Sequence, residues 1–310
     1  MRKVIGIGET VLDIIFKNEK PVEAVPGGST FNSVVSLGRA GDNVTFISET
    51  GDDRVGAYVR QFLSRNNVST DFFCVRPESK TPLSLAFLDE ANNADYVFYR
   101  EPARDPAEFS FPDIAADDIV VFGSFYAVAP ASRPQVAALL EQARQSGAII
   151  YYDVNFRPAH RGDIMKITPN LIDNLEYADI VRGSHDDFME LYRKDTAERV
   201  YRAETSFYCP RLVYTDGSHP VTVYSDGGFH KEYAMPPIDV VSTIGAGDNF
   251  NAGIVHALLK NNIRRADIER GLSEEQWDNL IATATAFSAN CCQDIHNYIS
   301  EEFGRSITAK

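Results

Sequence analysis

One stretch decides the fold: Ser242-Thr243-Ile244-Gly245-Ala246-Gly247-Asp248-Asn249-Phe250-Asn251-Ala252-Gly253. The apolar run Ile238 to Val241 comes before it and predicts a strand. Apolar residues then recur at the spacing of one helical face, at Phe250, Ile254, Ala257 and Leu258. The pattern predicts a strand, a glycine-rich turn and a helix whose first turn contains Asp248.

Two glycines and one carboxylate make this stretch chemically interesting. Gly245 and Gly247 carry no Cβ, so a ligand can approach the backbone closely. The free N–H groups of a first helical turn bind anions, and Asp248 stands beside them. This arrangement suits transfer of a charged group to a hydroxyl, although a plain turn with a dipole-stabilised acid is the alternative. The chain has no G-x-x-x-x-G-K-[ST] P-loop, and Phe250 replaces the third glycine of a dinucleotide fingerprint.

The same stretch resembles the C-terminal motif of the PfkB (ribokinase-like) carbohydrate kinases, D-T-x-G-A-G-D-x-F-x-x-G. Every fixed position matches except the first, where Ser242 replaces aspartate. The resemblance implies that Asp248 is the catalytic base and that Gly245, Ala246 and Gly247 form the anion hole. It also implies ATP as phosphate donor, with Mg²⁺. The replaced aspartate belongs to a monovalent-cation site in potassium-activated relatives, so we expect no strong dependence on potassium.

Two N-terminal motifs extend the resemblance to the sugar side. The segment from Gly27 to Asn32 resembles the family pattern G-G-x-x-x-N, and Asp13 occupies the usual position of the sugar-binding acid. Gly28 lets a hydroxyl-rich ligand touch the backbone, and Asn32 offers both a donor and an acceptor to a sugar diol. The resemblance therefore implies Asp13, Gly28 and Asn32 as substrate-binding residues. Taken alone, Asp13 would be a solvated acid at the end of a strand.

Two further segments are similar to those of fructokinase-like members. Asp153-Val154-Asn155-Phe156-Arg157 resembles D-x-N-x-R, and Tyr96-Val97-Phe98-Tyr99-Arg100 resembles a lid strand. The resemblance implies that Phe98 covers the sugar ring, that Arg100 reaches its oxygens, and that Arg157 holds a phosphate or sugar oxygen. The alternatives are a surface salt bridge for Arg157 and packing roles for the hairpin side chains.

The nucleotide side departs more from the family pattern. The segment Ala178 to Asp187 resembles A-D-x-x-K-x-N-x-x-E, with Arg182, Ser184 and Asp187 at the last three fixed positions. The resemblance implies phosphate contact by Ser184 and a magnesium contact by Asp187 through water. An arginine in place of lysine keeps the charge and changes its geometry.

A later loop and helix complete the nucleotide site. Thr215-Asp216-Gly217 resembles the T-x-G loop, which implies that Thr215 and Gly217 approach the phosphates of ATP, although Pro220 replaces the usual later glycine. Asn290 lies on a late helix whose asparagine lines the adenine pocket in relatives. A plain surface amide is the alternative for Asn290.

Short apolar strands alternate with amphipathic helices along the whole chain, which predicts a mostly parallel sheet covered on both faces. The β segments from Thr10 to Phe16 and from Leu83 to Tyr99 interrupt this alternation. We expect one domain over residues 1–310, a three-layer α/β/α ribokinase-like core with a small discontinuous β lid from about 10–27 and 82–101. The predicted core strands are Val4–Ile7, Val44–Ser48, Ile119–Phe122, Ala148–Asp153, Asp179–Val181, Leu212–Thr215 and Val221–Tyr224.

The composition of the chain limits the classes of partner that it is expected to bind. The chain has 310 residues and a net charge of −14, which argues against nucleic acid because backbone binding needs a basic face. No run approaches the ~20 apolar residues that span a bilayer. The four cysteines show no zinc spacing, so reduced thiols in the cytoplasm are expected.

We therefore expect an ATP-dependent sugar kinase that phosphorylates a primary hydroxyl, with fructose giving fructose 6-phosphate as the favoured reaction. A 2-keto-3-deoxygluconate kinase or a ribokinase is the alternative enzyme. The departures at Ser184, Pro220 and Ser242 keep open a catalytically weak sensor that binds sugar or nucleotide. The family also suggests a homodimer that forms through the lid.

Overall fold

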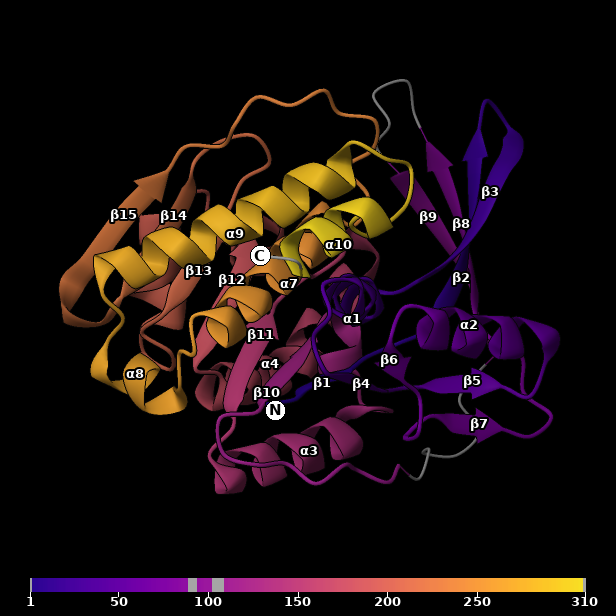
Figure 1. The fold of residues 1–310 in the computed structure, drawn as a ribbon, viewed down its shortest axis with the longest axis horizontal. Helices are drawn as coiled ribbons and strands as arrows, with labels where there is room; N and C mark the ends of the chain where they lie inside the picture. The colour runs from indigo at the N-terminus through magenta and orange to yellow at the C-terminus, as the bar shows by residue number, and fades with distance from the viewer. Residues whose placement is uncertain (1, 89–93, 102–108, 309–310) are drawn as a thin grey trace.

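A nine-stranded sheet forms the centre of the computed structural model, which describes residues 2–88, 94–101 and 109–308 (Figure 1). The strand order is β15-β14-β13-β12-β11-β10-β1-β4-β6, and neighbouring strands pair in parallel except that β14 pairs antiparallel with both β13 and β15. Their bounds are β1 Val4–Ile7, β4 Val44–Ile47, β6 Val68–Ser69, β10 Ile119–Gly123, β11 Ile149–Asp153, β12 Ile180–Ser184, β13 Leu212–Thr215, β14 Val221–Ser225 and β15 Phe229–Tyr233.

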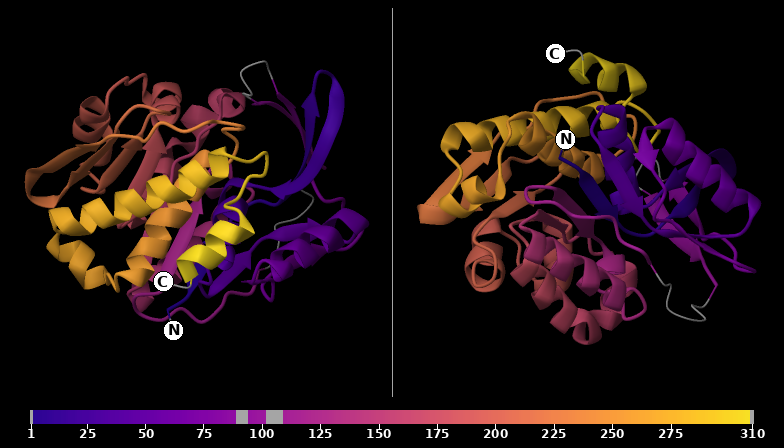
Figure 2. Two further views of the ribbon diagram at one scale, coloured as in Figure 1. Left: turned by 45° about the horizontal axis from the view of Figure 1, so that its top comes forward. Right: turned by 60° about the horizontal axis from the view of Figure 1, so that its bottom comes forward.

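Helices cover both faces of this sheet, as the two views in Figure 2 show. Alternate strand residues face opposite cores: Ile119 and Val121 pack with one set of helices, and Val120 and Phe122 with the other. The first set is α1 Ser29–Arg39, α2 Arg54–Arg65, α7 Ala246–Lys260, α8 Arg265–Arg270, α9 Glu274–Cys292 and α10 Glu301–Thr308. The second is α3 Arg133–Ser146, α4 Ile164–Tyr177, α5 His185–Tyr192 and α6 Ala197–Val200. The predicted three-layer α/β/α class is confirmed.

Short helical turns connect several of these elements. They are η1 Phe125–Ala127, η2 Pro158–Asp163, the π-helical η3 Tyr201–Thr205 and η4 Asp226–Gly228. Side-chain caps are present at the helix starts that the sequence indicates. Ser273 and Gln276 form a reciprocal capping box at the start of α9. Asp53 accepts from the Gly56 N–H at the start of α2.

The strand predicted over Ile238–Val241 is wrong. This segment is an irregular loop in which Val240 and Val241 are exposed. The Val241 N–H donates to the carbonyl of Cys292 at 2.8 Å, so its backbone pairs with the end of α9 and not with a strand. The residues have the composition of a strand, but the chain has left the sheet edge after β15.

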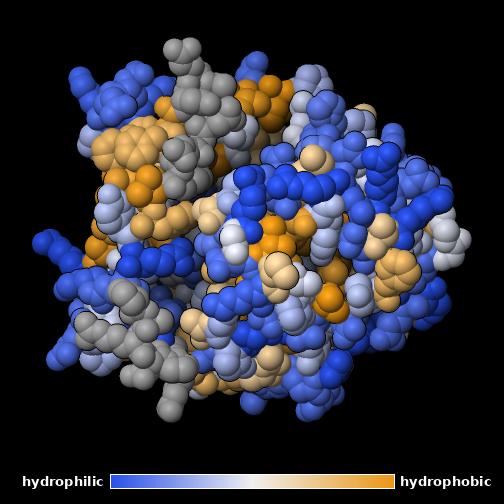
Figure 3. Space-filling view, turned by 180° about the vertical axis from the view of Figure 1, so that it is seen from behind, coloured by the Kyte–Doolittle hydropathy of each residue, from blue (hydrophilic) through white to orange (hydrophobic). Residues whose placement is uncertain are grey.

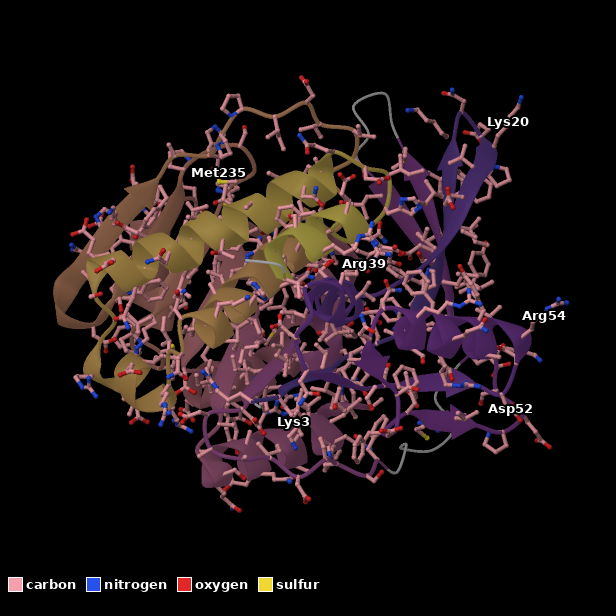
Figure 4. All side chains as sticks on the ribbon, in the orientation of Figure 1. Lys3, Lys20, Arg39, Asp52, Arg54 and Met235 are labelled. Carbon is pink, nitrogen blue, oxygen red and sulfur yellow. The ribbon has the colours of Figure 1, made fainter. Side chains whose placement is uncertain are left out.

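A second sheet of four strands stands beside the main body (Figure 1). It has the order β3-β2-β8-β9, with β2 and β8 parallel and the predicted hairpin β8–β9 antiparallel. Seen from behind, apolar side chains lie at the surface in this region (Figure 3), and Lys20 marks the tip of the β2–β3 hairpin (Figure 4). Residues 89–93, within the predicted lid, lie outside the described residues. The bounds are β2 Val11–Lys17, β3 Lys20–Gly27, β8 Leu83–Leu88 and β9 Ala94–Tyr99; β5 Glu49–Gly51 and β7 Cys74–Arg76 form a separate pair.

No helix in the described part of the chain is both long and apolar enough to cross a membrane. All four cysteines are free thiols, and three of them are buried.

Candidate active site

The polar residues of interest gather at the carboxyl edge of the parallel strands. Asp153 ends β11, Ser184 ends β12 and Thr215 ends β13, and the register of these strands places the three ends side by side. The first turn of α7 meets the same edge, because Asn251 of α7 donates to Asp153 at 2.8 Å. In sheets of this kind, ligands bind beyond this edge.

The glycines before α7 are needed for close packing of the backbone. Gly245 is the N-cap and has φ 78°, a left-handed conformation that favours glycine. A Cβ on Gly245 would lie 2.6 Å from the carbonyl oxygen of Asn297. A Cβ on Gly247 would lie 2.9 Å from Nη1 of Arg182. The backbone of this turn therefore packs directly against the Asn297 carbonyl and the Arg182 guanidinium, with no room for a side chain of its own at either glycine.

Asp248 lies in the first turn of α7 and is held by α1, from the other end of the chain. Ser29 donates to its Oδ1 and Asn32 to its Oδ2, both at 2.8 Å. Ser33 donates to its backbone carbonyl at 2.7 Å. Asp248 is only 7% exposed. The structure thus brings together Asp248 and Asn32, which the motifs name separately.

Burial raises the pKa of Asp248 because it disfavours the charged carboxylate. Hydrogen bonds from Asn32 and Ser29 oppose this shift, and so do the positive charges of Arg157 and Arg182. A buried carboxylate with a raised pKa is a suitable proton acceptor near neutral pH.

Asn155 supports this arrangement from the end of β11. Its amide donates to Ser29 Oγ at 2.6 Å, and Ser29 in turn donates to Asp248. Asn155 is buried and has a positive φ of 36°, which is uncommon for a residue other than glycine. Asn155 belongs to the D-x-N-x-R motif, but the motif predicts no role for it. Ser29 could not be predicted, because its position is variable in the G-G-x-x-x-N pattern.

Asp13 lies on β2, on the face of the second sheet that meets the main body. It accepts hydrogen bonds from Ser84 and from Asn297, the latter at 3.3 Å. Burial raises the pKa of Asp13 to about 6, opposed by the Ser84 hydrogen bond and assisted by the charges of Glu9 and Asp248. Those charges act because the three carboxyl groups share one region of the structure.

Gly28 joins this region to the turn before α1. It has φ 130°, and a Cβ there would lie 2.4 Å from the carbonyl oxygen of Glu9. Only glycine allows the β3–α1 junction to approach the end of β1 so closely.

Arg100 connects the second sheet to the main body. It donates to Glu9 at 3.0 Å, and its guanidinium lies 5.1 Å from the centre of the Phe98 ring. Both Arg100 and Glu9 are partly exposed, so the ion pair contributes little to stability by itself. His160 stacks on Phe125 close to these charges; burial lowers the pKa of its imidazole, while Glu9 raises it. No motif indicates His160. Arg157 is exposed, and its side chain forms no hydrogen bond or ion pair with the described residues, although its carbonyl accepts from the His160 N–H at 3.0 Å.

Ser184 and Asp187 are occupied with helix capping. Asp187 Oδ2 accepts from the Ser184 N–H and hydroxyl at 2.7 and 2.8 Å, which begins α5 with a capping box. Asp187 Oδ1 accepts from the Phe156 N–H at 2.7 Å. In the described ranges no group of three or more His, Cys, Asp or Glu side chains could hold a metal ion.

The remaining residues that were predicted to bind nucleotide lie in two separate parts of the structure. Thr215 accepts from Arg182 at 2.6 Å, and Gly217 stands in an open turn with φ 53°. Asn290 lies apart from them, where its side-chain oxygen accepts from the Ser300 N–H at 2.8 Å.

A cavity of about 590 Å³ lies between β15 and α9, beside the loop that follows β15. Met235 of this loop lies over α9 and accepts a hydrogen bond from Thr285 at 3.8 Å (Figure 4). Ala289 lines the cavity, and the neighbouring Asn290 does not. The lining residues are mostly small or apolar: Lys231, Glu232, Tyr233, Ala234, Pro236, Asp278, Ile281, Ala282, Thr285, Ala286 and Ala289.

Comparison with known proteins identifies the family of the chain and relatives that share its fold. The family model described as "pfkB family carbohydrate kinase" matches residues 1–299. Fructokinase of Salmonella typhimurium is 27% identical over 264 residues, which cover 84% of this chain and 86% of that protein. Aminoimidazole riboside kinase of the same organism is 24% identical over 301 residues, covering 94% and 88%. A crystal structure of a Vibrio cholerae fructokinase double mutant, bound to fructose, ADP and potassium, has a TM-score of 0.86 at 19% identity, covering 99% and 98%.

Asp13→Asn should stabilise the protein near neutral pH. The folded-state pKa of Asp13, about 6, exceeds the ordinary value of 3.8, so the folded protein binds this proton more tightly than the unfolded chain does. The carboxyl group therefore makes folding less favourable as pH rises between these values, by up to about 3 kcal/mol. Urea unfolding at about pH 5 and about pH 8 should show the advantage of the variant growing with pH.

The matched control is Asp52→Asn, in the exposed turn before α2 (Figure 4), which should show no such trend. An advantage of Asp13→Asn that is equal at both pH values, or larger at the lower one, would contradict the prediction.

Proposed function

Because the chain belongs to the pfkB family of carbohydrate kinases, we propose that Asp248 is the general base in phosphoryl transfer to a primary hydroxyl of a sugar. The observation that carries this proposal is the position of Asp248 in the first turn of α7, directly after the two glycines that begin the helix. Asp248 accepts the hydroxyl proton as the oxygen attacks the terminal phosphorus. The N–H groups of Gly245, Ala246 and Gly247 stabilise the negative charge on the transferring group.

The proposed sugar site lies between Asp248 and the second sheet. Asp13 binds hydroxyls as an acceptor, Asn32 contributes its amide, and Gly28 lets the sugar approach the backbone. Support comes from the shared region of Asp13 and Asp248, whose charges act on each other. Phe98 and Arg100 cover the sugar from β9, where Arg100 is already tied to Glu9.

Fructose is the acceptor we propose, giving fructose 6-phosphate. Its support is the pair of fructokinase-like segments, D-x-N-x-R and Y-V-F-Y-R, together with the identity to a fructokinase over most of the chain. Arg157 is exposed and close enough for its charge to act on Asp248, so it is placed to meet a phosphate or a sugar oxygen.

ATP is the proposed phosphate donor. Its adenine fits the cavity between β15 and α9, whose alanines and Pro236 offer a flat apolar surface, and Asn290 supports the wall from the next position along the helix. Ser184, Thr215 and Gly217 would contact its phosphates from the carboxyl ends of β12 and β13. Mg²⁺ neutralises phosphate charge when it is bound. Asp187 would meet it through water, since both carboxylate oxygens already accept hydrogen bonds.

The second sheet is the proposed lid, which keeps water from competing with the sugar for the phosphoryl group. Its strand β2 already supplies Asp13 to the site, and Arg100 of β9 ties it to the main body.

Asp248→Asn should lower kcat by about 10²- to 10⁴-fold, since that is the usual contribution of a general base. Its melting temperature should not fall, because burial already disfavours the charged carboxylate. Asp239→Asn, on the exposed loop before the turn, is the matched control and should keep wild-type turnover. Turnover of Asp248→Asn within a few-fold of wild type would remove Asp248 from the role of base.

A coupled assay of ADP release should show the fastest turnover with fructose. The panel includes ribose, 2-keto-3-deoxygluconate and aminoimidazole riboside, and each sugar is tested in sodium and in potassium buffers. Potassium should bring no large rise, because Ser242 lacks a charge and its hydroxyl accepts from the Ile244 N–H at 3.2 Å. Faster turnover with another sugar would correct the substrate, and sugar binding without ADP release would favour a sensor.

We also propose that two copies pair through the outer face of the second sheet. Along β2 the buried residues Val11, Asp13 and Ile15 alternate with half-buried apolar ones on this outer face. A sheet face that meets water is normally polar. The outer-face residues are Leu12, Ile14, Phe16, Leu83, Leu85 and Phe87, with the exposed Val97 and Tyr99 at the edge.

Leu85→Glu should convert this dimer to a monomer in analytical ultracentrifugation, because it buries a charge in an apolar interface. Lys20→Glu, at the hairpin tip outside that face, is the control and should stay dimeric. A wild-type protein that is monomeric at micromolar concentration would contradict the proposal.

A further inference from the structure

Asn297 lies in the bend that joins α9 to α10, close to the second sheet. It is 1% exposed, and its side-chain amide donates to Asp13 Oδ2 at 3.3 Å. A Cβ on Gly27, the last residue of β3, would lie 3.5 Å from Nδ2 of Asn297. The amide therefore lies near the end of β3 that leads into α1, and it bonds a side chain of β2.

The backbone of the same bend is fixed on the side of α7. The Asn297 carbonyl accepts from the side chain of Asn249 at 2.8 Å, and a Cβ on Gly245 would lie 2.6 Å from that carbonyl oxygen. The Ile299 N–H donates to Asn249 Oδ1 at 3.1 Å. Asn297 thus contacts the turn before α7 through its backbone and Asp13 through its side chain.

A purely structural role, in which the amide only ties the bend to the rest of the protein, is the simpler explanation. The next residue already does this, because the Tyr298 hydroxyl donates to the Pro26 carbonyl and its ring lies 5.3 Å from that of Phe62. A structural amide would also use both of its ends. Asn297 Oδ1 is buried and has no partner among the described residues, which costs stability. Folding alone therefore explains this amide poorly.

The amide has a clear effect on Asp13. Burial raises the pKa of Asp13, and the charges of Glu9 and Asp248 raise it further, while hydrogen bonds from Ser84 and Asn297 lower it. Ser84 donates to Oδ1 and Asn297 to Oδ2, so each carboxylate oxygen has one donor and keeps capacity for another. Without the amide, Oδ2 would have no donor among the described residues, and the carboxyl group would keep its proton to higher pH.

We propose that Asn297 is a positioning residue for the sugar: its hydrogen bond orients the Asp13 carboxylate toward the sugar hydroxyls and stabilises its charged form. This inference rests on the proposed kinase function. An ionised carboxylate accepts hydrogen bonds from hydroxyls at both oxygens, whereas a protonated one has to use one oxygen as a donor. Because the same bend contacts Gly245, one short segment positions an acid on the sugar side and a backbone turn on the phosphate side.

The first experiment measures fructose, or the sugar of the panel that turns over fastest. Asn297→Leu removes the donor at similar volume, so it should raise the KM for the sugar about 10-fold at about pH 6, as expected for loss of a hydrogen bond to a charged group. The defect should be smaller at about pH 8, where Asp13 ionises without help. The kcat and the KM for ATP should stay at wild-type values, because Asp248 keeps its partners.

The matched control is Asn66→Leu, which removes another buried asparagine, at the end of α2. Both ends of its amide are used, because Arg39 donates to Oδ1 and Nδ2 donates to the Phe62 carbonyl. The control should lower the melting temperature and leave the KM for the sugar unchanged at both pH values. Asn297→Leu should raise the KM without lowering the melting temperature at about pH 5, since it removes an unpaired buried oxygen.

A second experiment tests the contact without substrate. Urea unfolding at about pH 5 and about pH 8 measures the effect of Asp13→Asn in the wild-type and in the Asn297→Leu background. The folded-state pKa of Asp13 already exceeds the ordinary 3.8, so Asp13 makes folding less favourable as pH rises. Loss of the amide raises that pKa further. The gain from Asp13→Asn between the two pH values should therefore be about tenfold larger in the Asn297→Leu background, as an unfolding equilibrium constant.

Equal gains in the two backgrounds would overturn the inference, and so would a KM for the sugar that stays at the wild-type value or rises equally at both pH values. If Asn297→Leu does not fold, Asn297→Ala removes the same donor and replaces it in both experiments. A wild-type protein that phosphorylates no sugar would refute the proposed function, and the positioning role with it. The unfolding experiment identifies that case, because it reports the contact between Asn297 and Asp13 independently of turnover.

Discussion

The contact between α1 and α7 holds the site together through polar side chains. Ser29, Asn32 and Ser33 all donate to Asp248, and Ser36 donates to Asn249 at 2.5 Å. This seam joins two segments of the chain that are more than 200 residues apart. A buried carboxylate is costly unless donors surround it, so the seam keeps the acid ionisable and also fixes the distance between the two helices. The proposed sugar side and the proposed phosphate side of the site meet along this line.

The glycines of the decisive stretch serve different physical purposes. Gly245 allows a left-handed turn, and Gly247 allows the Arg182 guanidinium to lie against the backbone. Gly253 is further along α7, where a Cβ would lie 2.4 Å from Cα of Ala284 on α9. The first two let the proposed anion-binding turn pack against its neighbours, and the third lets two helices pack closely. A motif that looks like one functional unit therefore combines a ligand site with a core-packing constraint.

Sequence patterns predict the parallel core well because buried strands need continuous apolar runs. The bounds Val4–Ile7 and Leu212–Thr215 are confirmed residue for residue. The same reasoning fails at Ile238–Val241, since propensity carries no information on whether a sheet edge is available. Motif resemblance names Asp248 and Asn32, but their hydrogen bond is visible only in three dimensions. The hydrogen bond from Asn297 to Asp13 and the position of His160 could not be predicted, because both depend on how neighbouring elements orient a side chain.

Charge explains why this site needs positive groups of its own. The chain carries a net charge of −14, and Asp13, Asp153 and Asp248 are all buried near the carboxyl edge. Burial raises the pKa of both Asp13 and Asp153 to about 6, and the neighbouring carboxylates add to each shift. A neutral sugar is compatible with these acids, because its hydroxyls donate hydrogen bonds to them. A polyphosphate would be repelled unless the N–H groups of α7, a buried guanidinium and a divalent cation offset its charge. Arg182 lies against Gly247, so a buried positive charge stands beside the first turn of α7.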